Sequence, residues 1–397
     1  MHKKFLYLIA AGHLSVDINS GSLPAVLPFF VSEYGMDYTA VAGLMFASSF
    51  LSSIIQPITG YLADKGSKQW LMVLGIMLTG IAFASTGFLT NYWAIFAAVT
   101  IMGIGSAIFH PEAARLVNNI SGKAKGQGMS IFSVGGNGGF GLGPLLAVFL
   151  LTTFGMSGLV FYGVMSLCLG TVLLLFLPSL KKKAAGQKVV IQEKKAENGD
   201  AAQKSAIVLG HRNDWPAFAR LTLVILFRST VQSGLGSFLP LFCIKVLETS
   251  TAVGSATLSI ISIAGIAATL AGGRLADKCG YVKILRIGAC LLVPCLAVVA
   301  YSGSIWGVYL MLLPISMAIQ GPYSSFVVLG QSYLAKNICF ASGVTLGLSF
   351  SLGGIMIPSL GLFADNFGLD KVMILLFALS VISAALTFLL PQPQCDK

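Results

Sequence analysis

The feature that most restricts the fold of this chain is its succession of long apolar segments separated by short polar gaps. A helix needs about 20 consecutive apolar residues to cross a bilayer, and backbone polar groups within the hydrocarbon must be paired inside helices or closed barrels. Twelve such segments lie along the 397 residues, at approximately 5–32, 40–62, 70–89, 92–118, 127–151, 157–178, 216–245, 252–276, 282–302, 305–335, 341–364 and 371–390. The sequence therefore predicts an all-α polytopic membrane protein with twelve transmembrane helices.

The composition supports a protein whose main partner is the lipid bilayer. Hydrophobic residues make up 56% of the chain and charged residues only 10%, whereas about 25% of residues are charged in soluble domains. The net charge of +11 does not indicate a nucleic-acid partner, because most lysines and arginines lie in the short gaps. The seven cysteines are scattered and form no Cys-x-x-Cys pair, so we expect neither a disulfide framework nor a zinc site.

The basic residues also predict the orientation in the membrane. If the N-terminus is cytoplasmic, the gaps and helix ends on that side carry 22 of the 25 lysines and arginines. The opposite side carries five carboxylates, namely Glu33, Asp37, Glu248, Asp365 and Asp370. Because cytoplasmic loops are enriched in lysine and arginine, both termini are predicted to be cytoplasmic.

The only long polar stretch, Ser179 to Trp215, divides the chain into two sets of six helices. Its charge and low apolar content predict a solvated linker, part of which could lie as a helix on an anionic lipid surface. The predicted domains are therefore an N-terminal six-helix bundle over 1–178, a cytoplasmic linker over 179–215 and a C-terminal six-helix bundle over 216–397.

Landmarks in the first half recur in the second at nearly equal offsets of 211 to 214 residues. Leu27-Pro28 recurs as Leu239-Pro240, Gly60 to Lys65 as Gly273 to Lys278, Pro111 as Pro322, and Gly143-Pro144 as Ile357-Pro358. Together they predict two homologous halves. In transporters built from repeats, the substrate site lies between the repeats near the bilayer midplane.

The repeated Gly-x-Leu-Ala-Asp-Lys resembles the loop motif of the major facilitator superfamily, which lies between helices two and three and again between eight and nine. Its residues here are Gly60, Asp64 and Lys65 in the first copy and Gly273, Asp277 and Lys278 in the second. An aspartate at a helix end can accept hydrogen bonds from a neighbouring helix N-terminus and can pair with basic side chains. We expect these residues to hold one conformation of the protein and release it in another.

The glycines of the fifth segment match Gly-x-Gly-x-x-Gly, but they lie inside an apolar run and not after a strand, so a dinucleotide site is excluded. Gly135, Gly139 and Gly143, followed by Pro144, instead form a stripe at intervals of four residues. Such a stripe lets two helices approach closely. It is similar to the helix-five motif of facilitator-type antiporters, although Ala147-Val148 replaces the closing glycine pair.

Ionisable residues inside apolar segments are the candidates for a substrate or proton pathway. Each costs roughly 2.5–3.5 kcal/mol in hydrocarbon on insertion scales, so such residues usually face a bundle interior or a watery cavity. They are His13, Asp17, His110, Glu112, Arg115 and Arg228. The pairs His13-x-x-x-Asp17 and His110-x-Glu112 have spacings seen at metal sites, but the sequence offers no further ligands for either. We therefore expect no metal, no other cofactor and no enzyme activity.

At a finer level the chain resembles the fosmidomycin-resistance branch of the superfamily. The residues that carry this resemblance are Gly12-His13 with Asp17, Gly103-Ile-Gly105 with Phe109-His110-Pro111-Glu112-Ala113 and Arg115, Ser133-Val-Gly135-Gly136-Asn137 with Leu142-Gly143-Pro144, and Arg228-Ser229 with Phe238-Leu239-Pro240. The resemblance implies a monomeric plasma-membrane (inner-membrane) exporter of small compounds that is driven by the proton gradient. Two alternatives stay open, namely an uptake symporter or facilitator on the same fold and a membrane-embedded enzyme or sensor.

Specific roles are expected for these residues. Asp17 is favoured as the proton-coupling site, because it lies about 12 residues into the first helix, near its middle at 1.5 Å per residue. His13 is expected to tune Asp17, and His110 to tune Glu112. Arg228 is expected either to contact an anionic or zwitterionic substrate, because guanidinium matches carboxylate and phosphonate groups bidentately, or only to neutralise a carboxylate. Glu112 has a second possible role as a gating partner of Arg115.

Overall fold

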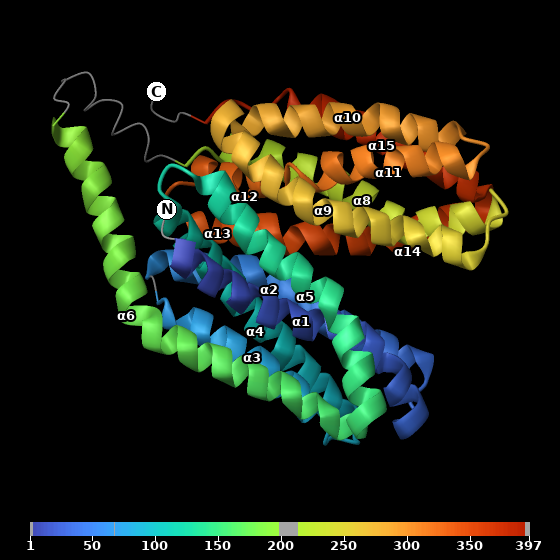
Figure 1. Cartoon of the computed structure of the whole chain (residues 1–397), viewed down its shortest axis with the longest axis horizontal. Helices are drawn as coiled ribbons and strands as arrows, with labels where there is room; N and C mark the ends of the chain where they lie inside the picture. The colour runs from blue at the N-terminus through green and yellow to red at the C-terminus, as the bar shows by residue number, and fades with distance from the viewer. Residues whose placement is uncertain (1–2, 67, 198–212, 394–397) are drawn as a thin grey trace. The chain divides into compact units, whose positions relative to one another are not determined.

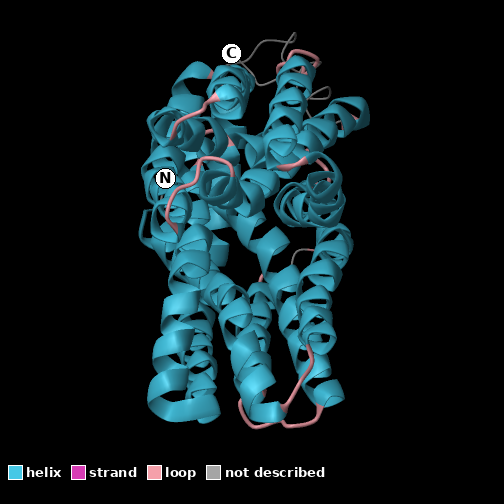
Figure 2. Cartoon of the chain, turned by 90° about the vertical axis from the view of Figure 1, so that its right-hand side faces the viewer, coloured by secondary structure: helices cyan, strands magenta, loops and turns pink. Residues whose placement is uncertain are grey.

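The structure is a computed structural model that describes residues 3–66, 68–197 and 213–393, in which every regular element is helical (Figures 1 and 2). The first half contains α1 (Lys3–Tyr34), α2 (Tyr38–Lys65), α3 (Trp70–Ser85), α4 (Tyr92–Ser121), α5 (Lys125–Phe154), the short η1 (Gly155–Leu159) and α6 (Val160–Glu197). The second half contains α8 (Trp215–Lys245), α9 (Thr251–Cys279), α10 (Tyr281–Tyr301), α11 (Ile305–Gln320), α12 (Tyr323–Tyr333), α13 (Ile338–Ser342), η2 (Gly343–Leu348), α14 (Ser349–Phe367) and α15 (Leu369–Thr387). Each predicted apolar segment coincides with one helix or one interrupted helix, which confirms the predicted fold class.

Two of the predicted segments are interrupted. The segment 305–335 divides into α11 and α12 at Gly321-Pro322, where proline has no N–H to continue the hydrogen-bond ladder. The segment 341–364 passes from α13 through a π-helical turn, η2, into α14. Such breaks are tolerated inside a membrane where neighbouring helices satisfy the released backbone groups.

Helix α6 is longer than the predicted span 157–178 and continues to Glu197, into the region expected to be a linker. The remainder of that predicted linker, 198–212, lies outside the described residues. By length and apolar composition, seven helical stretches of the described chain could each cross a membrane.

Contacts divide the chain into two compact units. The first comprises residues 1–211 with 336–347, and the second 212–335 with 348–397. The short segment 336–347 belongs to the first unit because α13 packs against α2 and α4. The predicted boundaries, which placed this segment in the C-terminal bundle over 216–397, therefore differ from the contact-based division at this point.

Corresponding helices pack in the same way within the two halves of the sequence. In the first half α1 packs along α5, α2 and α3 pack along α4, and α3 also contacts α6. In the second half α8 packs along α14, α9 and α10 pack along α11, and α10 also contacts α15. The same set of pairings thus occurs twice, as the repeated landmarks in the sequence predict.

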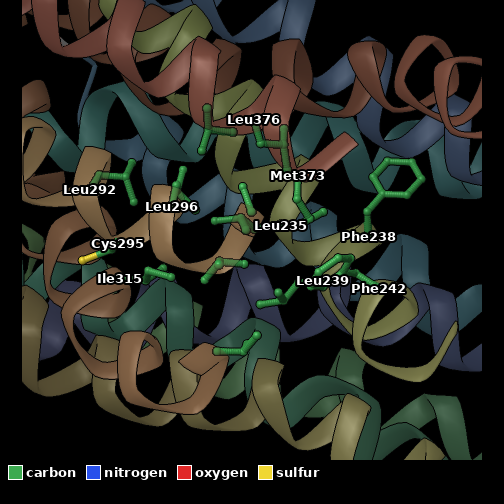
Figure 3. Packing of buried hydrophobic residues seen from close by; sticks show 14 of the residues in the cluster. Leu235, Phe238, Leu239, Phe242, Leu292, Cys295, Leu296, Ile315, Met373 and Leu376 are labelled. Atoms are coloured by element: carbon green, nitrogen blue, oxygen red, sulfur yellow. The ribbon is translucent and has the colours of Figure 1, made fainter. Parts of the chain in front are cut away.

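Each unit has its own apolar core. That of the first unit includes Phe30, Phe83 and Tyr162, and that of the second includes Leu235 and Met373, which Figure 3 shows among their neighbours. Many large apolar side chains nevertheless point outward, as Trp93, Leu175 and Ile263 do. Outward-facing apolar residues on so many helices suit a lipid environment, because they would form unusually large apolar patches in water.

Candidate functional site

Two histidines and an aspartate meet between α1 and α4 in the first unit. Nε2 of His13 lies 3.1 Å from Oδ2 of Asp17, one turn further along α1. Nε2 of His110, on α4, lies 3.3 Å from Oδ1 of the same carboxylate and 3.1 Å from Nε2 of His13. All three side chains are buried, with 4 to 7% of each residue exposed. We call this group the His-Asp-His cluster.

Backbone carbonyls fix the orientation of both imidazole rings. Nδ1 of His13 donates to the carbonyl oxygen of Phe132 on α5 at 2.7 Å, and its ring stacks on the Phe132 ring with centroids 4.0 Å apart. Nδ1 of His110 donates to the carbonyl oxygen of Ser106, one turn back along α4, at 2.8 Å. A carbonyl oxygen can only accept, so the hydrogen of each neutral ring is on Nδ1 and each Nε2 presents a lone pair to the cluster.

The cluster is compact. Its nitrogen and oxygen atoms lie within 4.8 Å of one another, so one small cation could contact all three side chains. Gly136 of α5 leaves space beside it, because a Cβ there would lie 2.5 Å from Nε2 of His13 and 2.6 Å from Oδ2 of Asp17. The sequence did not offer a third side chain for the His13 and Asp17 pair, and the fold supplies it from α4.

The position of His110 differs from the expectation that it tunes Glu112. Residues two apart on a helix point in widely different directions, and here His110 faces Asp17 on α1 while Glu112 faces α13. His110 therefore interacts with Asp17 and His13 of α1.

A second group of polar contacts holds the end of α2 against α13. The two carboxylate oxygens of Asp64 accept hydrogen bonds from the backbone N–H groups of Cys339 and Phe340, each at 2.9 Å. Gly60 permits this approach, because a Cβ there would lie 2.7 Å from the carbonyl carbon of Cys339. A carboxylate at a helix N-terminus is stabilised by unpaired N–H groups and by the helix dipole. We call this contact the Asp64 latch.

Arg115 and Glu112 of α4 extend the latch. Nη1 of Arg115 donates to the carbonyl oxygen of Ala63 at 3.1 Å and lies 3.9 Å from Oε2 of Glu112. The thiol of Cys339 lies 3.6 Å from both Nη1 of Arg115 and Oε2 of Glu112. The structure thus places Glu112 and Arg115 together at α13, as partners of each other. Lys65, in contrast, is exposed and lies over the ring of Tyr61.

The second copy of the loop motif lies at the end of α9. Asp277 accepts a hydrogen bond from the hydroxyl of Tyr281 at 2.7 Å, Gly273 is buried and Lys278 is exposed. The two aspartates therefore make different contacts, although the motifs match in sequence.

The glycine stripe of α5 lies along α1. A Cβ at Gly139 would lie 2.7 Å from both the amide nitrogen of Ile18 and the carbonyl oxygen of Leu14. Gly135 and Gly143 likewise face the α1 backbone, and Pro144 follows within α5. This close approach brings the carbonyl oxygen of Phe132 within reach of His13.

Arg228 is buried in α8 of the second unit, with 7% of the residue exposed. Its Nη2 donates to the carbonyl oxygen of Ile319 at 2.5 Å, in the last turn of α11. Its guanidinium lies over the rings of Tyr323 and Phe326, with centroids 5.9 and 5.0 Å away. Nε has no hydrogen-bond partner, and none of the ion pairs found between described residues includes Arg228.

Arg228 also lines a small cavity within the second unit, whose other walls include Phe326, Ser380, Ser383 and Thr387. Sequence reasoning did not find Cys339, the Phe132 carbonyl or the Ile319 carbonyl as partners of the candidate residues. Only the Ile319 carbonyl lies near a possible signal, the dipeptide Gly321-Pro322, but other prolines of this chain lie inside helices without ending them.

Two six-helix repeats, buried ionisable side chains in the spanning segments and a repeated loop motif define a membrane transporter, a class of protein that is not enzymatic. The chain belongs to the Major Facilitator Superfamily, whose family model matches residues 9–358. It is 28% identical over 98% of its length to the "Uncharacterized MFS-type transporter YfnC" of Bacillus subtilis, of which it covers 93%. It is 25% identical over 92% of its length to the "Fosmidomycin resistance protein" of Escherichia coli, of which it covers 87%.

Solved structures show the same fold. The transporter FucP in its outward conformation matches with a TM-score of 0.71 and 16% identity, over 96% of this chain and 98% of FucP. The human organic anion transporter MFSD10 matches with a TM-score of 0.70 and 18% identity, again over 96% and 98% of the two chains.

Proposed function

We propose that this transporter exports small anionic or zwitterionic compounds from the cytoplasm by alternating access, and that protons moving inward drive the export. It would act in the plasma membrane, the inner membrane of a two-membrane cell, with both termini cytoplasmic. The asymmetric distribution of lysine and arginine along the sequence supports this orientation.

The observation that supports an anionic or zwitterionic substrate is the set of contacts that Arg228 makes. A buried charge is normally paired, because removing it from water without compensation is costly. Arg228 makes its closest polar contact with one backbone carbonyl and leaves Nε without a partner. A guanidinium with an unused N–H group suits a carboxylate or phosphonate, which accepts parallel hydrogen bonds from it.

Similarity supports the direction of transport. The Escherichia coli relative is named as a fosmidomycin resistance protein, and transport that removes fosmidomycin from the cell would give resistance. Fosmidomycin carries a phosphonate group and is therefore a suitable probe for this chain.

The experiment is transport of labelled fosmidomycin into everted membrane vesicles, where the cytoplasmic face is outside. Export then appears as uptake, and respiration acidifies the lumen. We expect accumulation above that of vesicles without the protein, and its loss when a protonophore collapses the gradient. Accumulation only in right-side-out vesicles would instead identify an uptake symporter, and transport that never exceeds equilibrium would identify a facilitator.

A further inference from the structure

The His-Asp-His cluster brings three hydrogen-bond acceptors into mutual contact. Both Nε2 atoms present lone pairs, because the hydrogens of the neutral rings are held on Nδ1 by the carbonyl groups of Phe132 and Ser106. The third acceptor is the carboxylate of Asp17. The three contacts measure 3.1, 3.1 and 3.3 Å, which are hydrogen-bond distances. With no added proton none of these contacts has a donor.

The position of an added proton can be decided by counting the contacts that it satisfies. A proton on one oxygen of Asp17 can bond only to the imidazole next to that oxygen. A proton on Nε2 of His13 faces both the other Nε2 and Oδ2 of Asp17, each at 3.1 Å. A proton on Nε2 of His110 likewise faces Nε2 of His13 and Oδ1 of Asp17. The imidazole position therefore satisfies two of the three contacts, and the carboxylate position satisfies one.

Intrinsic basicity favours the same position. A free imidazole retains its proton to a pH about 2.6 units higher than a free aspartate does. The two Nδ1–H groups donate to carbonyl oxygens, which stabilises a positive ring. A charged imidazole would also lie beside the ionised carboxylate of Asp17.

The surroundings add no competing charge to the cluster. The side of α5 that contacts it presents Phe132 and Gly136, neither of which titrates. On α4, Glu112 and Arg115 interact with each other and with Cys339 of α13. On α6, the polar contacts with α1 are those of Ser166 with Ser15 and Asn19 and of Tyr162 with Ser22. Helix α3 contains no ionisable residue, and on α2 the carboxylate of Asp64 binds α13 while Lys65 is exposed. Within the described chain, the three cluster residues are therefore the ones available to share a proton here.

We propose that the transporter carries its coupling proton on an imidazole, shared between the Nε2 atoms of His13 and His110, while Asp17 stays ionised as the counter-charge. The proposal rests on the proposed proton-driven export for its physiological meaning. The site itself can be tested without transport, so failure of the one is distinguishable from failure of the other.

The test uses the small number of histidines, of which the chain has only four. The intact protein is labelled with ¹⁵N in histidine, placed in lipid and examined by solid-state NMR, in which nitrogen shifts distinguish both neutral tautomers and the charged ring. Substituting His2→Gln and His211→Gln, both in polar parts of the sequence, assigns the remaining signals to the cluster without altering it.

We expect two neutral rings with hydrogen on Nδ1 at high pH, and one additional proton on Nε2 within the range of about pH 5 to 8. The ¹³C-labelled carboxyl of Asp17 should stay ionised throughout, and Asp17→Asn should remove the charged ring from this range. The proposal is overturned if the Asp17 carboxyl takes the proton while both rings stay neutral, or if elemental analysis finds a stoichiometric metal in the purified protein.

Transport supplies a separate readout. In everted vesicles, His110→Gln should reduce gradient-driven fosmidomycin accumulation to the level of vesicles without the protein, while substrate exchange without a gradient continues. The matched control is His211→Gln, which should accumulate fosmidomycin as the parent does. Full gradient-driven accumulation in both His13→Gln and His110→Gln would contradict an imidazole carrier even if export itself is confirmed.

Discussion

Asp17 contacts the Nε2 atoms of both His13 and His110, so changes to it affect the whole cluster. Replacement by asparagine keeps the size of the side chain but removes its charge. The new amide can also donate a hydrogen bond to one Nε2, which satisfies a contact that otherwise requires a proton.

We therefore predict that Asp17→Asn abolishes gradient-driven accumulation of fosmidomycin while binding or exchange is partly retained. The measurement is accumulation in everted vesicles with and without an imposed proton gradient. Asp370→Asn, which changes an exposed carboxylate beside Lys371, is the control and should behave as the parent does. Accumulation against a gradient by the Asp17→Asn protein would show that the cluster is not obligatory for coupling.

A second prediction concerns Arg228. Lysine retains the positive charge but lacks the planar guanidinium group that can donate two parallel hydrogen bonds. Arg228→Lys should therefore lose one charge-assisted hydrogen bond to the substrate. Such bonds contribute about 1.5–3 kcal/mol, and 1.4 kcal/mol corresponds to about tenfold in affinity. We expect fosmidomycin to bind about tenfold to a hundredfold more weakly, as measured by equilibrium binding in detergent.

The control for this variant is Arg220→Lys, also on α8 but exposed. Arg228→Lys with the affinity of the parent would mean that Arg228 serves only to bind the Ile319 carbonyl at the end of α11.

At this scale the sequence indicates which ionisable side chains lie within the spanning segments, but it does not specify all of their partners. His13 and Asp17 lie one helical turn apart, so their contact follows from helix geometry. The contact of Asp17 with His110 joins residues on different helices, and no local pattern specifies it. The expected pairing of His110 with Glu112 differs from the contacts in the structure for a related reason: residues two apart on a helix point in different directions, and His110 contacts Asp17 and His13 of α1.

At the scale of helices, α1 and α5 are the pair whose packing positions the cluster. The glycine stripe allows their backbones to approach, and the Phe132 carbonyl of α5 then reaches His13. A side chain within the stripe would separate the two helices.

We predict that Gly139→Ala destabilises the protein, because the new Cβ would lie 2.7 Å from two backbone atoms of α1. Overpacking of this kind costs about 1–3 kcal/mol, and thermal unfolding in detergent would measure the loss. Gly141→Ala is a matched control in the same helix, because a Cβ there meets nothing within 4 Å. Equal stability of the two variants would show that the stripe does not limit packing.

The Asp64 latch gives a prediction for α13. Asp64→Ala removes the acceptor of two N–H groups at the helix start, a change that costs about 1 kcal/mol or roughly fivefold in an opening equilibrium. Cys339 is completely buried, so its reaction with maleimide reports this opening. In a background without other reactive cysteines, we expect faster labelling in Asp64→Ala than in Asp277→Ala. Unchanged labelling would mean that the latch does not hold α13.

The positions of the helices could be predicted because hydrocarbon thickness sets the length of a spanning helix. The interruptions within two of these helices could not be predicted in this way. Proline occurs inside many of these helices without ending them, for example at Pro111 in α4 and Pro144 in α5. Pro322 does separate two helices, and what distinguishes it is its surroundings: Arg228 of another helix satisfies a carbonyl exposed beside the break.

At the scale of the whole molecule, the repeat and the charge distribution were both visible in the sequence. The repeated helix pairings agree with the repeated landmarks. The two halves nevertheless differ in chemistry. The first unit holds two imidazoles and a carboxylate whose ligand atoms lie within 4.8 Å of one another, whereas the second unit holds a buried guanidinium whose Nε has no hydrogen-bond partner.

The last prediction is the orientation of the chain in the membrane. The two ends of α5 offer a direct test, because exposed Lys123 lies just before it and exposed Thr153 lies in its last turn. The basic end should be cytoplasmic, since positively charged loops are retained on that side during insertion. In intact cells with the other reactive cysteines replaced, a membrane-impermeant maleimide should label Thr153→Cys but not Lys123→Cys, and everted vesicles should show the reverse. Labelling of Lys123→Cys in intact cells would place the basic loops outside, and it would reverse the direction of transport inferred from everted vesicles.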